Sequence, residues 1–162
     1  MSAIVTGRSA PILAAVVCAV FANALAAGDD KQGQSYDVSA WAIRASKSNN
    51  EVSLKLKPIV KDLKKRFNYT GFKLERKKQG KTSEGKALSI DLTAGFKAKV
   101  TPLERKGSRV KLKIEVTKRE GKQDKPLLNT TVGLDRGKFH LQGGWKIDSK
   151  SADVLIIAVS AR

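Results

Sequence analysis

Residues Val110–Thr117 read VKLKIEVT, and apolar and polar side chains alternate along the whole stretch. Successive side chains of a β-strand point to opposite faces of the sheet. The alternation therefore predicts a strand with one apolar face and one solvated face. Half-buried strands are typical of antiparallel sheets, so this stretch sets the expected fold class: a sheet whose apolar face another layer must cover.

Further strands are expected wherever alternation or a short apolar run recurs. They comprise residues 38–45, 72–76, 88–92, 96–101, 127–134, 139–147 and 154–161. Residues Val154–Val159 read VLIIAV and are apolar at every position. A strand of that composition is usually covered on both faces, which predicts a place in the interior of the sheet with a helix on one side.

One segment has helical periodicity; it begins at Pro58 and ends near Asn68. Proline suits the first helical position, since the N–H that it lacks has no partner there. The apolar stripe consists of Ile59, Val60, Leu63 and Phe67. A helix this short is marginal alone, so its stripe must pack on the sheet. We therefore predict an α+β fold, in which one amphipathic helix packs on an antiparallel meander sheet of about seven strands.

The first residues have the pattern of an export signal. Arg8 is followed by the apolar run Ile12–Ala22 and by small residues at Ala24–Ala27. A basic start, an apolar run and a small-residue site in that order are typical of a cleavable signal peptide. We assign residues 1–26 to it and expect an exported protein, periplasmic or extracellular. The alternative is an uncleaved anchor, although the apolar stretch is shorter than the roughly 20 residues that span a bilayer.

The remaining chain is expected to form one domain. Residues 27–35 (AGDDKQGQS) are polar and without period, which predicts a flexible linker. Residues 36–162 contain no second linker, so we assign them to a single α+β domain. Cys18, the one cysteine, lies in the predicted signal peptide, so the mature chain makes no disulfide despite its export.

The charge is strongly positive. Lys and Arg number 32 against 15 Asp and Glu, for a formal net charge of +17. Loss of Arg8 with the signal peptide leaves +16 (17 − 1). An excess of one sign creates a field that attracts oppositely charged partners, which predicts an anionic partner. The alternative is that surface lysines only keep the strands from associating.

The basic residues fall in three places. On the predicted strands, Lys97 and Lys99 share the solvated face with Lys111 and Lys113. A hairpin centred near Lys106 would set Lys99 opposite Lys113 and Lys97 opposite Glu115. A second group occupies the loop expected before the third strand and consists of Arg76, Lys77 and Lys78 with Lys81 and Lys86. A third group lies on the polar face of the helix. The candidate anion-binding residues are Lys61, Lys64, Lys65, Arg66, Arg76, Lys77, Lys78, Lys97, Lys99, Lys111 and Lys113.

Signals for other chemistry are missing from the sequence. A hydrolytic triad normally needs a histidine, and His140, the single histidine, is expected on an outward-facing strand position. The acidic residues are scattered, so no metal site is predicted, and no Gly-rich phosphate loop or cofactor motif occurs. The aromatic residues fall mostly on apolar faces, which disfavours nucleic acid as the partner. Asn68 and Asn129 lie in N-glycosylation patterns, and whether either is modified stays open.

One part of the chain resembles a known family. Residues Leu134–Gly144 read LDRGKFHLQGG, and Val154–Val159 follow them as a final apolar strand. A glycine turn, a strand that ends in Gly-Gly and an apolar last strand are similar to the closing strands of bacterial secretins. The similarity covers only these segments, so no family is assigned, and it implies at most a role in envelope assembly.

Together these features predict a non-enzymatic, exported binding or assembly module without a cofactor. Its basic face is expected to engage an anionic partner: membrane head groups, an anionic glycan or an acidic protein. The alternative is a structural subunit of an envelope or secretion assembly that docks through the edge of its sheet. A nucleic-acid-binding protein or an enzyme is less consistent with the sequence. The identity of the partner and the oligomeric state are not specified by the residues.

Overall fold

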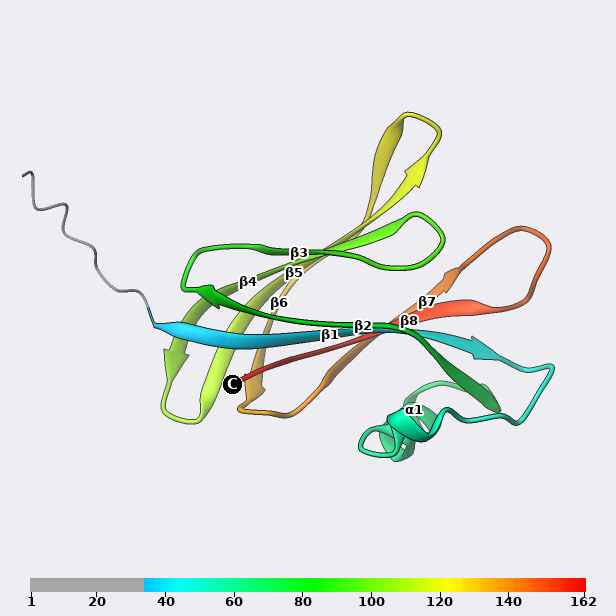
Figure 1. The fold of residues 1–162 in the computed structure, drawn as a ribbon, viewed down its shortest axis with the longest axis horizontal. Helices are drawn as coiled ribbons and strands as arrows, with labels where there is room; N and C mark the ends of the chain where they lie inside the picture. The colour runs from blue at the N-terminus through cyan, green and yellow to red at the C-terminus, as the bar shows by residue number, and fades with distance from the viewer. Residues whose placement is uncertain (1–33) are drawn as a thin grey trace, which may run out of the picture. The chain divides into compact units, whose positions relative to one another are not determined.

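The strands of the protein dominate its computed structural model, which describes residues 34–162 (Figure 1). The elements are β1 (Ser35–Ser46), the 3₁₀ turn η1 (Leu54–Leu56), α1 (Val60–Arg66), β2 (Gly71–Ser83), β3 (Leu88–Asp91), β4 (Phe96–Lys106), β5 (Arg109–Glu120), β6 (Gln123–Asp135), β7 (His140–Lys146) and β8 (Val154–Ala161). The predicted signal peptide and linker residues 27–33 lie outside the described residues. Strand β1 already begins at Ser35, the last residue of the predicted linker.

The strands form two sheets of four strands each. Sheet I has the order β2-β1-β8-β7, and sheet II has the order β3-β4-β5-β6. The predicted α+β class with a single meander sheet is therefore wrong: the protein is a two-sheet β-sandwich with one short helix. The physical reason is the short length of the helix that was expected to cover the apolar face of the sheet. Helix α1 has seven residues and cannot cover the apolar faces of so many strands, so a second sheet covers them instead.

The chain passes between the two sheets twice. Strand β1 is followed by α1 and then by β2, which pairs antiparallel with β1. The chain then crosses to sheet II, where β3 to β6 form an uninterrupted meander (Figure 1). It returns with β7 and β8, and β8 inserts between β1 and β7. The order of elements along the chain is thus as predicted, whereas their division between two sheets is not.

The first hydrophobic cluster lies between the two sheets. Sheet II contributes the apolar face of β5, where all four alternating residues are fully buried: Val110, Leu112, Ile114 and Val116. The strand and the apolar face predicted from VKLKIEVT are thereby confirmed. Sheet I contributes alternate residues of its two central strands: Val38, Ala40, Ala42, Leu155, Ile157 and Val159.

The second hydrophobic cluster lies on the outer face of sheet I, beneath the helical segment. Leu56 of η1 packs there with Ile59 and Leu63, against Trp41 and Ile156 among others. The predicted stripe is correct in part, because Ile59 and Leu63 are buried whereas its other two residues are half-buried. Helix α1 is also shorter than the predicted span of residues 58–68, and η1 supplies part of the cover that the longer helix was expected to give.

Strand β8 lies where the sequence predicts it. All eight of its residues are buried, and it pairs with β1 on one side and β7 on the other. Leu155 faces the first cluster and Ile156 faces the second, with α1 on that side. Residues Val154 to Val159 are apolar at every position because neither face of this part of β8 meets water, and Ser160 is the one polar residue of the strand.

Candidate functional site

Four of the predicted anion-binding lysines share the outer face of sheet II, as the alternation requires. They are Lys97, Lys99, Lys111 and Lys113. Carboxylates lie among them: Lys113 Nζ is 3.2 Å from Glu115 Oε1, and Lys111 Nζ is 3.3 Å from Glu104 Oε1. These lysines therefore belong to a mixed surface of both signs, which presents a weaker field to an anion than lysines alone.

The predicted pairing of these lysines across the β4–β5 hairpin is wrong. Lys99 lies opposite Glu115 and not Lys113, and Lys97 lies opposite Thr117. The turn comes later in the chain than expected, and a bulge in β4 lies between it and the lysines. The observed pairing sets opposite charges against each other, which stabilises a sheet where like charges would destabilise it.

The basic residues expected in a loop lie on β2 instead. This strand runs to Ser83, and Arg76 and Lys78 project from it toward β3. Arg76 Nη1 donates a hydrogen bond to the carbonyl oxygen of Asp91 at 3.1 Å, and Lys78 Nζ donates to that of Ser89 at 3.3 Å. Apolar alternation is absent here, so the strand is made by pairing with β1 and not by its own pattern.

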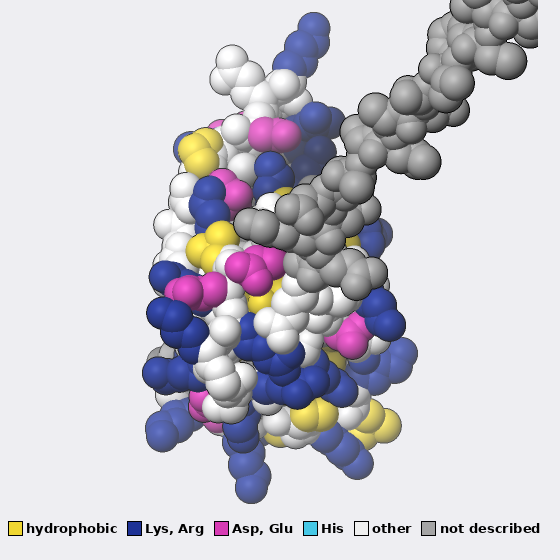
Figure 2. Space-filling model, turned by 90° about the vertical axis from the view of Figure 1, so that its left-hand side faces the viewer, with side chains coloured by type: hydrophobic (Ala, Val, Ile, Leu, Met, Phe, Trp, Pro, Cys, Tyr) yellow, Lys and Arg dark blue, Asp and Glu magenta, His cyan; other side chains and the backbone are white. Residues whose placement is uncertain are grey.

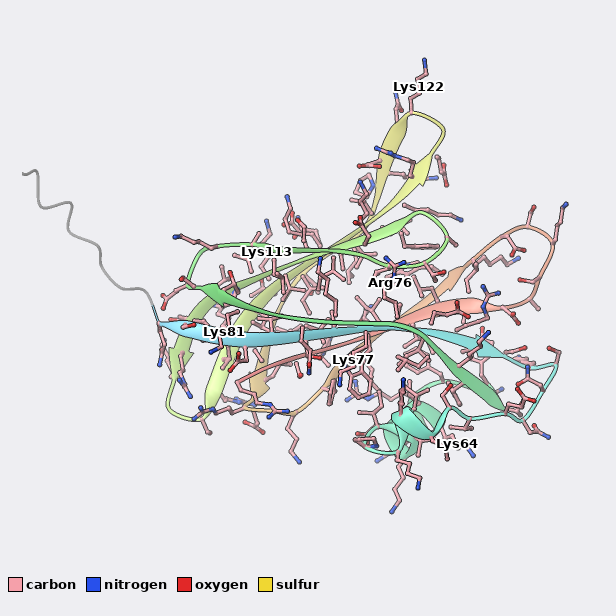
Figure 3. The ribbon with its side chains drawn as sticks, in the orientation of Figure 1. Lys64, Arg76, Lys77, Lys81, Lys113 and Lys122 are labelled. Atoms are coloured by element: carbon pink, nitrogen blue, oxygen red, sulfur yellow. The ribbon has the colours of Figure 1, made fainter. Side chains whose placement is uncertain are left out.

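The remaining predicted residues lie on the opposite side of the sandwich from the sheet II lysines. The four from α1 are all exposed: Lys61, Lys64, Lys65 and Arg66. Lys77 of β2 lies on the same side as α1, with its Nζ 5.0 Å from the centre of the Trp41 ring. Figure 3 shows Lys64 and Lys77 on one side of the molecule and Lys113 on the other. The eleven predicted cations thus do not form one face, and anion binding by them stays a prediction.

The distribution of charge over the surface agrees with this. Figure 2 shows Lys and Arg side chains spread over the visible face, with Asp and Glu side chains among them. On this face the positive charge is therefore distributed and not gathered in one patch.

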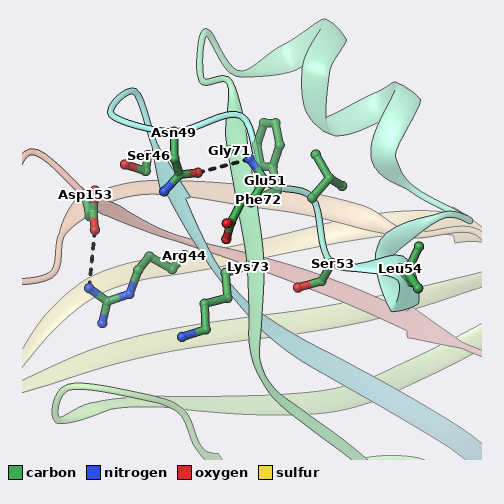
Figure 4. Close-up of a pocket in the computed structure, with 11 residues that line it drawn as sticks. Arg44, Ser46, Asn49, Glu51, Ser53, Leu54, Gly71, Phe72, Lys73 and Asp153 are labelled. Atoms are coloured by element: carbon green, nitrogen blue, oxygen red, sulfur yellow. Dashed lines mark hydrogen bonds and ion pairs between the residues drawn. The ribbon is translucent and has the colours of Figure 1, made fainter.

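A hollow lies beside the ends of β1 and β2 (Figure 4). It has a volume of about 600 Å³ and holds the guanidinium of Arg44. Arg44 Nε donates to Glu75 Oε1 at 3.0 Å, and its Nη1 donates to Asp153 Oδ2 at 3.4 Å. Burial lowers the pKa of Arg44, the two carboxylates raise it, and the net result is a raised pKa. Since the charge is already matched, this group ties β1 and β2 to the segment before β8 rather than awaiting a ligand.

The sheet edges differ in how they are protected. The edges of β2 and β3 lie against each other, joined by the hydrogen bonds from Arg76 and Lys78. Strand β7 has seven residues, and its register shifts between Gly143 and Trp145, which interrupts the edge. Strand β6 has thirteen residues and no strand of residues 34–162 on its outer side. Natural proteins blunt sheet edges by shortness, bulges, proline or charge. Strand β6 has a register shift at Leu127 beside Pro126, and from Leu128 to Leu134 it is a long edge without any of these protections.

The open edge of β6 carries no charge from Leu127 to Leu134, which read LLNTTVGL. Leu128 and Val132 point inward and are half-buried on the first cluster. On the outer face, Asn129 is exposed, as are the residues two and four positions further on. In an antiparallel strand, alternate residues direct their N–H and C=O groups away from the one neighbour, so half of this backbone is free to pair. An uncharged run of similar length also forms the buried central strand β8, so this run does not by itself identify an edge.

A small hollow adjoins this edge at Gly133. It has a volume of about 240 Å³, and Lys106, Arg109, Lys111 and Glu104 border it. A hydrogen bond from Lys111 and the charge of Lys106 lower the pKa of the Glu104 carboxyl. Nothing lies within 4 Å of the position that a side chain at Gly133 would occupy. The edge is therefore open above its backbone as well as beside it.

The predicted outward-facing position of His140 is wrong, because its side chain is half-buried. It pairs with Val159 of β8, whose side chain belongs to the first cluster, and paired residues share a face. Its Nε2 is buried and has no hydrogen-bond partner among the described residues. Burial lowers the pKa of His140, and the charge of Arg66 lowers it further.

Two features are absent from residues 34–162. No group of three or more His, Cys, Asp or Glu side chains in this part of the chain is arranged to hold a metal ion. Neither helical segment of this part combines the length and the apolar character that a membrane crossing requires.

No protein-family model matches this chain, and no curated protein matches it. Among solved structures, it is similar to the T2SS secretin XcpQ from Pseudomonas aeruginosa, determined by cryo-EM. The two have 10% sequence identity and a TM-score of 0.29, and the match covers 78% of this chain and 55% of that chain. The match thus spans about half the length of XcpQ. A TM-score this low supports no conclusion about fold or function.

Proposed function

We propose that the protein is a non-enzymatic assembly module that docks on a partner protein through the open edge of β6. The partner supplies an extended segment, which adds as a further strand to sheet II. This makes the chain a structural subunit of a larger assembly. The observation that carries the proposal is the thirteen-residue outer strand with an uncharged stretch and an unpaired backbone edge.

Strand addition is favoured because the edge supplies both affinity and register. Main-chain hydrogen bonds from an added strand bind to the free N–H and C=O groups, and side-chain positions on the two faces select the sequence. The open space at Gly133 gives such a strand room for one side chain on the outer face of sheet II. The other three edges are shorter, interrupted or closed by side chains, so they offer less to a partner.

The net charge contributes to this function at long range. A field of one sign accelerates the encounter with an oppositely charged partner and does not need a single patch. The basic residues predicted to bind an anion are therefore given a steering role here. An anionic membrane or glycan bound by one basic face has less support, because the predicted cations lie on opposite sides of the sandwich.

The place of action is proposed from the sequence. Residues 1–26 have the pattern of a signal peptide, which supports export and an assembly in the cell envelope or outside the cell.

A photo-crosslinking side chain at Thr131, on the outer face of the β6 edge, tests the proposal in the native host. We expect one discrete crosslinked protein, and we expect it to disappear when Asn129→Lys places a charge on the same edge. The matched control is the same crosslinker at Ser89, which is exposed on the short strand β3. No product from Thr131, an equal product from Ser89, or a product that is a second copy of the chain would contradict docking on a partner at β6.

A further inference from the structure

The outer face of sheet I is divided into an apolar half and a polar half. Helix α1 and η1 cover the apolar half, where Ile43 and Ile156 lie. Toward the other end of the same strands, the outward positions become Ser39 and Ser160, which pair across β1 and β8. Gln79 of β2 pairs with Ser39 and extends the polar row. No helix of the described residues covers this half.

A cavity of about 500 Å³ lies over the polar half, between the sheet and the helical segment. The polar row forms its floor, and Lys55 and Pro58 form the wall on the side of η1 and α1. Phe139 lies beside the floor, with its ring centre 4.7 Å from that of Trp41. Small-molecule sites in proteins usually have volumes of about 300–1,000 Å³, so the size suits a ligand of one or two rings.

The floor of this cavity has hydrogen-bonding capacity that the protein does not use. Ser160 is 4% exposed and Ser39 is 7% exposed. Ser39 Oγ accepts a hydrogen bond from Trp41 Nε1 at 2.8 Å, which leaves its own O–H free to donate. Among residues 34–162, no hydrogen bond engages Oγ of Ser160. Both hydroxyls can therefore donate a hydrogen bond to a polar ligand in the cavity.

The charged side chains that line the cavity are all basic. Lys55, Lys77 and Arg162 line it, and no Asp or Glu does. None of the three forms an ion pair with an acidic side chain within residues 34–162. An adjoining hollow shares Ser39, Gln79, Ser160 and Arg162 with it, and that hollow is bordered by Asp37. The three basic side chains of this lining thus have no carboxylate side chain of the same lining beside them.

The side chain of Lys77 is positioned by the ring of Trp41. Its Nζ lies 5.0 Å from the centre of the Trp41 ring, in a cation–π contact, and Figure 3 shows Lys77 on the side of the strands that α1 occupies. A cation that is already positioned loses less side-chain freedom when an anion binds. The contact thus favours binding at this cavity over binding at the freely exposed lysines of α1.

We propose that this cavity binds an acidic sugar. Lys55 and Lys77 hold the charged group of the sugar, while the hydroxyls of Ser39 and Ser160 bond to its hydroxyls. Phe139 contacts the C–H face of the ring. A bare inorganic anion would use the cations but not the polar floor, and a neutral sugar would leave the cations unused. The site lies on sheet I and does not depend on docking at β6.

Calorimetric titration of the whole chain tests the ligand class. The probes are glucuronate, glucose 6-phosphate, glucose and inorganic phosphate. We expect one or both acidic sugars to bind, glucose not to bind, and phosphate to bind more weakly than either. The comparison of the two acidic sugars distinguishes a carboxylate from a phosphate as the charged group. Equal binding of phosphate and the acidic sugars, equal binding of glucose, or no binding of either acidic sugar at millimolar concentration overturns the proposal.

Variants locate the site. Lys77→Met keeps the alkyl chain over Trp41 and removes the charge, and Ser160→Ala removes one hydroxyl of the floor. Each is expected to weaken binding by about tenfold, because a hydrogen bond to a charged or buried group is lost. The matched control is Lys111→Met on sheet II, which removes the same charge far from the cavity and should leave binding unchanged. An equal loss in the control means that the net charge and not the cavity attracts the sugar. Lys55→Met replaces Lys77→Met if the latter does not fold.

Discussion

Glu115 of β5 lies directly opposite Lys99 of β4, and its carboxylate is also 3.2 Å from the ammonium group of Lys113. Glu115→Lys replaces these attractions by repulsion between three lysines on one surface. Opposed pairs contribute roughly 0.2–1 kcal/mol each, so we expect the free energy of unfolding to fall by about 1 kcal/mol. Urea titration measures it, and about 1 M salt should remove most of the loss. Glu51→Lys is the control, since Glu51 forms no ion pair among the described residues; an equal loss there would contradict the pairing.

Removal of β8 is expected to prevent folding. Five large apolar side chains of this strand are buried, and each contributes roughly 1.5–3 kcal/mol. Their sum approaches the whole stability of a typical domain, about 5–15 kcal/mol. A chain that lacks residues 153–162 should therefore show no cooperative thermal transition by circular dichroism. Deletion of residues 28–33 is the control and should leave the transition in place. A truncated chain that melts within a few degrees of the intact one would show that β8 is dispensable.

Stability should depend on pH through His140. Its folded-state pKa is lowered below the usual 6.5, first by burial and then by Arg66. As the pH falls below 6.5, the unfolded chain takes up a proton that the folded chain does not, so stability is lost toward the lower folded pKa and is fully present above 6.5. His140→Phe should reduce the difference in urea midpoint between about pH 7.5 and about pH 5.5. An unchanged difference would show that other groups carry the dependence.

Substitution by alanine should lower the stability of the protein at Gly143 of β7 and leave it nearly unchanged at Gly133 of β6. A Cβ at Gly143 would lie 2.5 Å from both Ile156 Cα and the carbonyl oxygen of Leu155, and its φ of 155° is itself unfavourable for other residues. Gly143→Ala should destabilise the protein by about 1–3 kcal/mol through overpacking against β8. Gly133→Ala meets nothing within 4 Å and should change the urea midpoint little. Equal midpoints for the two variants would show that β7 shifts away from β8 at no cost.

The sequence predicts single strands well because each apolar face follows from alternation alone. Val110 to Val116 and Val154 to Val159 show this, since their burial on one face and on both faces is what the residue pattern requires. The number of sheets depends on what covers those faces. Which layer covers a face is a long-range property of the chain, because Ala40 and Ala42 of β1 pack in one cluster with residues of β5 across the sandwich. The local sequence around these alanines does not indicate this packing.

Register and the candidate site were harder to predict for the same reason. The β4–β5 turn is set by Gly107, whose φ of 60° lies in the left-handed region, and the bulge near Pro102 then shifts the pairs beyond it. The lysines on each strand were identified correctly, but their partners were not. The cavity on sheet I has no signal in the sequence, because Ser39, Lys55 and Ser160 are far apart in the chain and no local pattern links them.

Strands β1 and β8 are a common wall of the two hydrophobic clusters, since their alternate residues face opposite sides. Separation of this one pair would open both clusters to water at once. The helical segment packs on one of these clusters and sheet II packs on the other, so both depend on the same two strands. We therefore expect the two clusters to unfold cooperatively. Amide protons of α1 and β5 should consequently share a global exchange step, although a helix of seven residues would exchange almost freely by itself.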